Sequence, residues 1–151
     1  MSMANIIVDS REKQPYSFKE DFVVAKLDTG DYSLEGYENI FTVDRKATVS
    51  ELAGNLTTAR FKRELERMKS FKHAYLLLEF SFDDILRFPY GSDIPRKRWK
   101  YLKVRPPFII SALTRISLEY GVHIIYGGNR DNARDILTSL LKNFGKLYEK
   151  N

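Results

Sequence analysis

The stretch GDYSLEGYENIFTVDRK, residues 30–46, alternates apolar and polar side chains as a β-hairpin does. Its middle, GYEN at residues 36–39, has the composition of a turn, and a four-residue loop there would place Asp31 opposite Asp44. A slip of one residue would bring acids opposite core residues, so burial of one apolar face favours this register. That face collects Tyr32, Leu34, Phe41 and Val43.

The same register sets two carboxylates, Asp31 and Asp44, side by side on the other face, with Lys46 in reach. Like charges opposite each other destabilise a sheet, so the pair calls for a cation, and Mg²⁺ or Mn²⁺ accepts such oxygen ligands. A metal that acidifies bound water, beside a lysine that stabilises developing charge, can hydrolyse a phosphodiester. The alternative is that these residues lie on a solvated sheet face, the commoner fate of charged strand residues.

Composition indicates one globular domain, residues 1–151, with 43% hydrophobic residues and a formal charge of +5 that suits a polyanion such as DNA. The absence of cysteine excludes disulfides and thiolate metal sites, so any metal would bind oxygen. The sequence shows neither a signal peptide nor a membrane span. We therefore expect no membrane attachment and a cytoplasmic or nucleoid-associated protein, or a nuclear one in a eukaryote.

The remaining pattern predicts strands alternating with helices. Strands are expected at residues 5–10, 22–27, 73–80 and 122–128, and helices at 49–72, broken near Gly54, from Pro107 to Gly121, and at 132–148. This order predicts an α/β fold with a mixed central sheet flanked by helices, ending in a helix-strand-helix tail at residues 106–148. The last helix is apolar over a broad arc, which predicts a homodimer through the C-terminal helices or, alternatively, complete packing inside one chain.

Residues 89–105 read as a basic loop. Its second half, RKRWKYLKVR, interleaves six basic residues with two aromatic ones, a mixture that can neutralise phosphates and stack on bases. The alternative is a solvated loop whose tryptophan is tucked into the core. The predicted nucleic-acid contacts are Arg96, Lys97, Arg98, Trp99, Lys100, Tyr101, Lys103 and Arg105.

Residues 6–80 contain six motifs in a characteristic order: IIVDSRE, LDTGDYSL, VDRK, SEL, RFKRELERM and AYLLLEF. In these motifs the chain resembles the nuclease domain of XPF-type structure-specific endonucleases, the xeroderma pigmentosum F family. The resemblance implies a restriction-endonuclease-like fold and a DNA endonuclease dependent on Mg²⁺ or Mn²⁺ that cuts flap, fork or branched DNA. Two rivals stay open, a catalytically inactive DNA-binding or scaffold module of the same fold and a restriction-like or resolvase-like nuclease.

The resemblance also implies roles for individual residues. Asp31 of GDY and Asp44 of DRK are similar to the metal-binding carboxylates, and Lys46 to the catalytic lysine. The upstream VDSRE motif supplies an active-site group, with its glutamate as a further metal ligand, and the helix after the site supplies an arginine for phosphate. These residues are Asp9, Arg11, Glu12 and Arg60.

The chain departs from the family pattern at two positions. Asp44 stands where the family has glutamate, and Ser50 occupies the place of a later acid, so that Glu51, one residue on, becomes a possible site residue. Arg45 points to the face opposite Asp44 in the hairpin, and we expect its side chain to pack or to bind phosphate nearby.

Overall fold

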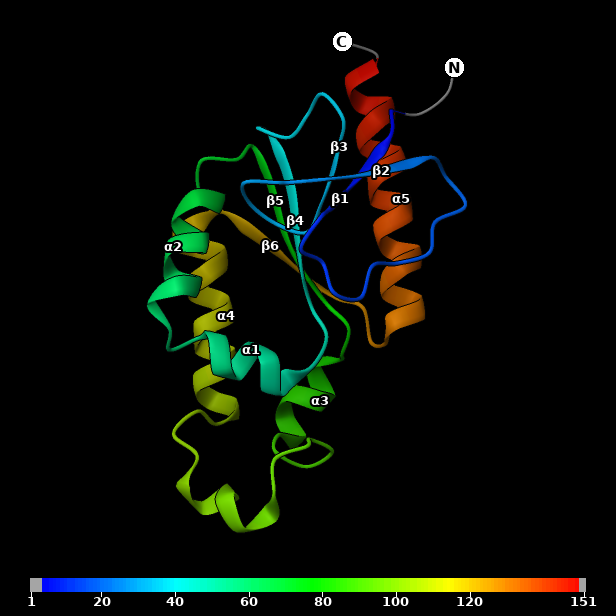
Figure 1. Ribbon diagram of the computed structural model, residues 1–151. Helices are drawn as coiled ribbons and strands as arrows, with labels where there is room; N and C mark the ends of the chain where they lie inside the picture. The colour runs from blue at the N-terminus through cyan, green and yellow to red at the C-terminus, as the bar shows by residue number, and fades with distance from the viewer. Residues whose placement is uncertain (1–3, 150–151) are drawn as a thin grey trace.

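The computed structural model describes residues 4–149, in which six strands form one mixed sheet with helices on both faces (Figure 1). The strand order is β2-β1-β3-β4-β5-β6. β3 is antiparallel to both neighbours, and the other pairs are parallel, so the predicted mixed α/β sheet is confirmed. The strands are β1 (Ile6–Asp9), β2 (Phe22–Ala25), β3 (Tyr32–Leu34), β4 (Phe41–Lys46), β5 (His73–Leu78) and β6 (Val122–Tyr126).

The hairpin of β3 and β4 has the predicted register, because Tyr32 pairs with Val43. The connection is longer than the predicted four-residue loop, because β3 ends at Leu34 and β4 begins at Phe41. Before β3 the chain turns at Gly30 with φ of 82°, where an added Cβ would lie 2.1 Å from Thr42 Oγ1. Glycine is therefore required both by its conformation and by the close approach of the strands.

Both faces of the hairpin are buried. The apolar face, with Tyr32 and Phe41 fully covered, packs against α5 (Arg130–Glu149). The other face is covered as well, leaving Asp44 at 4% and Lys46 at 8% exposure. A solvated sheet face is thus excluded for these two residues, and something specific must stabilise their charges.

Two helices, α1 (Val49–Asn55) and α2 (Ala59–Met68), follow the hairpin and lie beside the sheet (Figure 1), where residues of both helices line one pocket with Asp44. The predicted break between them is confirmed, and each begins at a threonine whose side chain accepts a hydrogen bond from the first turn. β5 then returns beside β4 in parallel.

The second half contains two elements that the pattern did not predict. One is α3 (Phe82–Arg87), which a capping box of Ser81 and Asp84 begins, and the other is a short 3₁₀ helix, η1 (Arg96–Tyr101), inside the basic loop. Both are too short to show a clear apolar period. The predicted helix before Gly121 is confirmed as α4 (Pro106–Tyr120), and Gly121 ends it with φ of 66°.

The apolar arc of α5 is used within the chain. Leu137, Leu141 and Phe144 are buried against the sheet, and Leu140 and Tyr148 pack partly buried on the same core. Complete packing inside one chain therefore accounts for these residues, and the homodimer stays a prediction. Across residues 4–149, no helix combines the length and apolar character needed to cross a membrane.

Candidate active site

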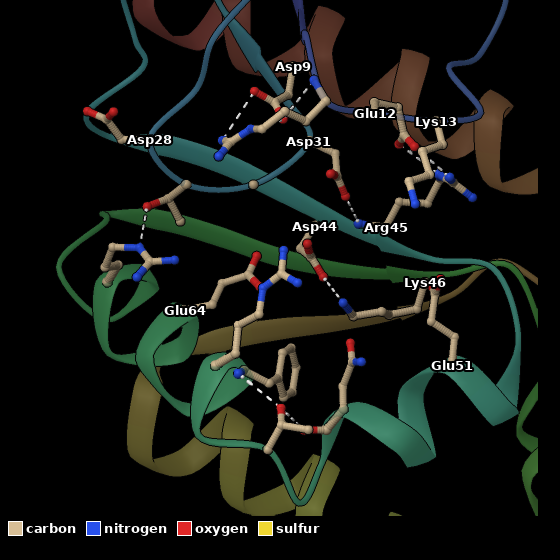
Figure 2. A pocket seen from close by; sticks show the side chains of 18 residues that line it. Asp9, Glu12, Lys13, Asp28, Asp31, Asp44, Arg45, Lys46, Glu51 and Glu64 are labelled. Carbon is tan, nitrogen blue, oxygen red and sulfur yellow. Dashed lines mark hydrogen bonds and ion pairs between the residues drawn. The ribbon is translucent and has the colours of Figure 1, made fainter.

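A pocket lies between the β3–β4 hairpin, the loops after β1 and β2, and helices α1 and α2 (Figure 2). It gathers the site residues predicted from the hairpin and from the flanking motifs, although they are distant in sequence. Those that line it are Asp9, Arg11, Glu12, Asp31, Asp44, Arg45, Lys46, Glu51 and Arg60. The basic residues 96–105 do not line this pocket.

Asp31 and Asp44 are electrostatically coupled. Asp31 directly precedes β3, and its Oδ2 accepts a hydrogen bond from the Arg45 amide at 2.8 Å. Burial, with the adjacent Asp44 carboxylate, raises the pKa of Asp31 far above its usual range. The repulsion expected from the hairpin register is thus present in the folded chain.

Lys46 neutralises part of this negative charge. Its Nζ lies 3.0 Å from Asp44 Oδ2 and 4.9 Å from the centre of the Phe61 ring. Burial alone would lower the pKa of Lys46, but the Asp44 and Glu64 carboxylates outweigh it and raise that pKa. Lys46 is therefore a buried ammonium that stays charged at neutral pH.

Glu64 on α2 is a site residue that the sequence reasoning missed. It lines the pocket, and burial together with the neighbouring Asp44 raises its pKa to about 8. The pattern KRELER reads as a solvated, charged helix face. The spacing nevertheless indicates that Glu64 lies on the buried side of α2, because it stands three residues after Phe61 and four before Met68, both of which are buried.

The upstream residues Asp9 and Arg11 brace the rim of the pocket. Buried Asp9 accepts a hydrogen bond from the Leu27 amide at 2.8 Å, which ties the end of β1 to the chain after β2. Arg11 pairs with Asp9 at 3.1 Å, and its side chain is 61% exposed. Arg60, also exposed, lies at the start of α2 on the pocket wall.

Glu12 and Arg45 form a buried ion pair. Arg45 Nη2 lies 2.7 Å from Glu12 Oε1, and Arg45 Nε donates to Glu12 Oε2 at 2.9 Å. Burial raises the pKa of Glu12, but the hydrogen bonds from Arg45 and the Gln14 amide outweigh it, so the net pKa is lowered. Both oxygens of Glu12 are occupied by Arg45, and its role as a metal ligand stays a prediction.

Glu51, the possible site residue, caps α1. Its Oε1 accepts from the Ala47 amide at 2.9 Å, while its own amide donates to Thr48 Oγ1 at 3.0 Å. Thr48 is the N-cap of α1, so the side chain of Glu51 bonds the residue just before the cap and its amide bonds the cap itself. Glu51 therefore stabilises the first turn after Lys46, at the edge of the pocket.

Of the three predicted metal ligands, Asp31 and Asp44 remain for a metal, and Glu64 lies beside Asp44. Within residues 4–149, no group of three or more His, Asp or Glu side chains is arranged to hold a metal ion. Two carboxylates nevertheless suit Mg²⁺ or Mn²⁺, which often take one or two protein ligands and fill their shell with water and phosphate. Asp44 Oδ2 is buried, and the group that it faces is the Lys46 ammonium, 3.0 Å away. An oxygen of this kind fits a cation ligand.

The basic segment 96–105 combines a packed tryptophan with exposed charges. Trp99 is half-buried, donates from Nε1 to the Ile94 carbonyl at 2.9 Å and contacts the Tyr90 ring edge-on. Arg96 lies over the Trp99 ring at 5.2 Å. Tyr101 is 72% exposed, and all six basic side chains of the segment are exposed.

A model of the ERCC4 domain matches residues 8–140. The chain belongs to the ERCC4 domain family. This family consists of DNA nucleases, which agrees with the XPF-type resemblance of the motifs. A comparison with curated protein sequences finds no match.

Solved structures share the fold of this ERCC4 domain. XPF from Aeropyrum pernix superposes with a TM-score of 0.67 at 19% identity, over 91% of this chain and 60% of that one. The same protein in complex with DNA gives 0.66 at 18% identity, over 97% of this chain and 66% of that one. The chain thus spans less than two thirds of these proteins, and the predicted XPF-like, restriction-endonuclease-like fold is confirmed.

Proposed function

We propose that this ERCC4 domain is a DNA endonuclease that hydrolyses phosphodiester bonds with Mg²⁺ or Mn²⁺. The observation that carries the proposal is the meeting of Asp31, Asp44 and Lys46 in one pocket, buried and electrostatically coupled. An ammonium held against a carboxylate pair costs folding free energy unless the charges are satisfied, so such an arrangement is typical of a functional site.

Each residue has a distinct part in this chemistry. Asp31 and Asp44 would hold the cation, which when bound acidifies water and polarises the scissile phosphate. Lys46, which stays protonated, stabilises the negative charge that develops on the phosphate oxygens. Arg11 and Arg60, exposed on the pocket wall, can bind the adjacent phosphates of the DNA strand.

DNA is the proposed substrate, with flap, fork or other branched forms as the preferred structures. The XPF structure from Aeropyrum pernix that contains DNA has the same fold, and the chain here carries an exposed cluster of basic and aromatic residues at 96–105. Such a cluster binds phosphates and stacks on unpaired bases, which occur where duplex and single strand meet.

Homodimer formation through the C-terminal helices is proposed as well, and sedimentation at several concentrations tests it.

The decisive experiment is a cleavage assay on labelled linear, flap, fork and four-way DNA, each with Mg²⁺, Mn²⁺ or EDTA. We expect cutting with either metal, none with EDTA, and a loss of roughly a thousandfold in Asp31→Asn and Lys46→Ala, because both act directly on the reacting groups. DNA affinity in EDTA should change little in Asp31→Asn.

Three results would contradict the proposal or part of it. A wild-type protein that binds DNA but cuts none of the substrates would favour the inactive DNA-binding or scaffold module. Cutting that survives both substitutions would place the active site elsewhere. Cutting of linear DNA as fast as branched DNA would favour a restriction-like enzyme of the same fold.

A further inference from the structure

A buried ionic network lies on the face of β4 opposite Asp44 and Lys46, and two of its members, Glu12 and Arg45, also line the pocket. Its centre is the Arg45 guanidinium, which sits between Glu12 at 2.7 Å and Glu79 Oε1 at 3.2 Å. All three side chains are nearly inaccessible, with exposures of 8%, 5% and 5%. Figure 2 shows Glu12 beside Arg45 on one side of the strand and Lys46 with Asp44 on the other.

Two further residues complete the network around Glu79. The Tyr16 hydroxyl donates to Glu79 Oε2, and Arg130 Nη1 lies 3.4 Å from the same oxygen. Arg130 also donates to the carbonyls of Gln14 and Pro15, at 2.9 Å and 3.0 Å. The first residue of α5 is thereby tied to the loop after β1 and to the end of β5.

The charges in this network balance. Glu12 and Glu79 supply two negative charges, and Arg45 and Arg130 two positive ones. Tyr16 stays neutral, because burial and the Glu79 carboxylate both raise the pKa of its hydroxyl, and its ring lies 4.7 Å from the Arg130 guanidinium. A balanced, hydrogen-bonded set is rigid, whereas loss of one member leaves a buried charge without a partner.

The network is connected to the pocket through the backbone of β4. Arg45 stands between Asp44 and Lys46 in sequence, and its amide donates to Asp31 Oδ2 at 2.8 Å. The amide of Glu79 donates to the Lys46 carbonyl at 2.9 Å. The backbone amides of Arg45 and Glu79 therefore hold the Asp31 carboxylate and the Lys46 carbonyl, while the side chains of the same two residues meet in the network.

We propose that Glu79, together with Tyr16 and Arg130, is a positioning element for the hydrolysis: it locks the Arg45 side chain so that the Arg45 amide stays aimed at Asp31. This rests on the proposed function. None of the three residues lines the pocket, so they act through Arg45 and not on the DNA. Their role is to keep Asp31 beside Asp44 against the repulsion between the two carboxylates.

The test compares Glu79→Gln, which removes the charge and keeps the shape, with wild type. We expect the single-turnover cleavage rate to fall by roughly tenfold or more while the DNA dissociation constant in EDTA stays within about twofold, because positioning partners affect the chemical step more than binding. Tyr16→Phe, which keeps the ring stacked on Tyr32, should give a smaller loss of rate. Glu20→Gln is the matched control, because Glu20 pairs with Lys142 at 2.9 Å away from this network, and it should cut at the wild-type rate.

A second readout does not depend on cleavage. In metal-free ¹⁵N-labelled protein, the amide resonance of Arg45 should shift in Glu79→Gln and in Arg130→Met and stay in place in Glu20→Gln. Arg130 is 40% exposed, so Arg130→Met serves if Glu79→Gln fails to fold. Wild-type cleavage rates in the foldable variants, with an unmoved Arg45 resonance, would overturn the inference. If wild type cuts no DNA, the proposed function fails, and the Arg45 resonance still decides whether the network positions this strand.

Discussion

Asp44 is the residue on which the charges of the pocket converge. Lys46 binds it directly. Burial and, after it, the like charge of Asp44 raise the pKa values of Asp31 and Glu64. When no cation is bound, the folded state therefore favours the protonated forms of Asp31 and Glu64. The pocket stores unfavourable electrostatic energy in its metal-free form, as sites arranged to bind cations commonly do.

A pH prediction follows for Glu64. Its folded pKa of about 8 lies above that of an unfolded glutamate, so its contribution to stability is full below the unfolded value and is lost as pH rises through the folded one. In metal-free buffer, Glu64→Gln should therefore melt at a higher temperature than wild type by a few degrees near pH 9, with a smaller difference near pH 5. Thermal melts across this range measure it, and Glu66→Gln, an exposed acid on the same helix, is the control. An equal difference at all pH values would contradict the assignment.

Among the elements, the 89–105 segment differs most from the rest of the fold. It lies outside the sheet at the end of the molecule near α3 (Figure 1), and its short η1 helix exposes the basic side chains while Trp99 packs on Tyr90. The tryptophan is half-buried and the basic side chains are exposed, and the contact of this segment with DNA stays a prediction.

This segment should bind DNA through its charge. Replacing Lys97, Arg98 and Lys100 with alanine should weaken DNA binding. It should also make the slope of log affinity against log salt concentration shallower, by roughly 0.9 for each phosphate contact that is lost. The matched control removes three lysines that lie together beside α5, Lys19, Lys142 and Lys146, and should leave the salt dependence of the affinity unchanged. Fluorescence anisotropy at several salt concentrations in EDTA measures both. Equal slopes in the two triple variants would show that the segment does not contact DNA.

At the scale of the whole molecule, one sheet separates two apolar cores. The α5 side holds the hairpin aromatics, and the other side holds α1, α2 and α4 with Ile94, Leu102 and Val104 packed partly buried against it. Residues 89–105 are thus anchored to the second core by these three side chains. Neither core can lose its helices without exposing the sheet that the other one shares.

We therefore expect one cooperative unfolding transition for the whole chain. Trp99 is the single tryptophan and lies in the peripheral segment, so its fluorescence reports that segment while far-UV circular dichroism reports the helices. The two melting curves should coincide within error. A fluorescence transition at lower temperature than the dichroism would mean that the segment detaches before the sheet unfolds, and the Trp99 packing would then be a weak contact.

The sequence by itself determined the features that depend on local pattern. Alternation in residues 30–46 set the hairpin register, and with it Asp31 beside Asp44, because a one-residue slip would expose the apolar face. Period and capping residues likewise placed α1, α2, α4 and α5, and the ordered motifs pointed to the ERCC4 family. These properties are encoded by neighbours a few residues apart.

Only the tertiary structure decided which distant side chains complete the site. Glu64 reaches Asp44 because α2 crosses the β4 face, and Glu79, Tyr16 and Arg130 surround Arg45 because β5 and α5 end beside it. The side-chain partners in that network are separated by 33 to 63 residues. The local periodicity of the sequence does not predict such contacts, because they depend on how the layers pack and on the partner that each buried charge needs.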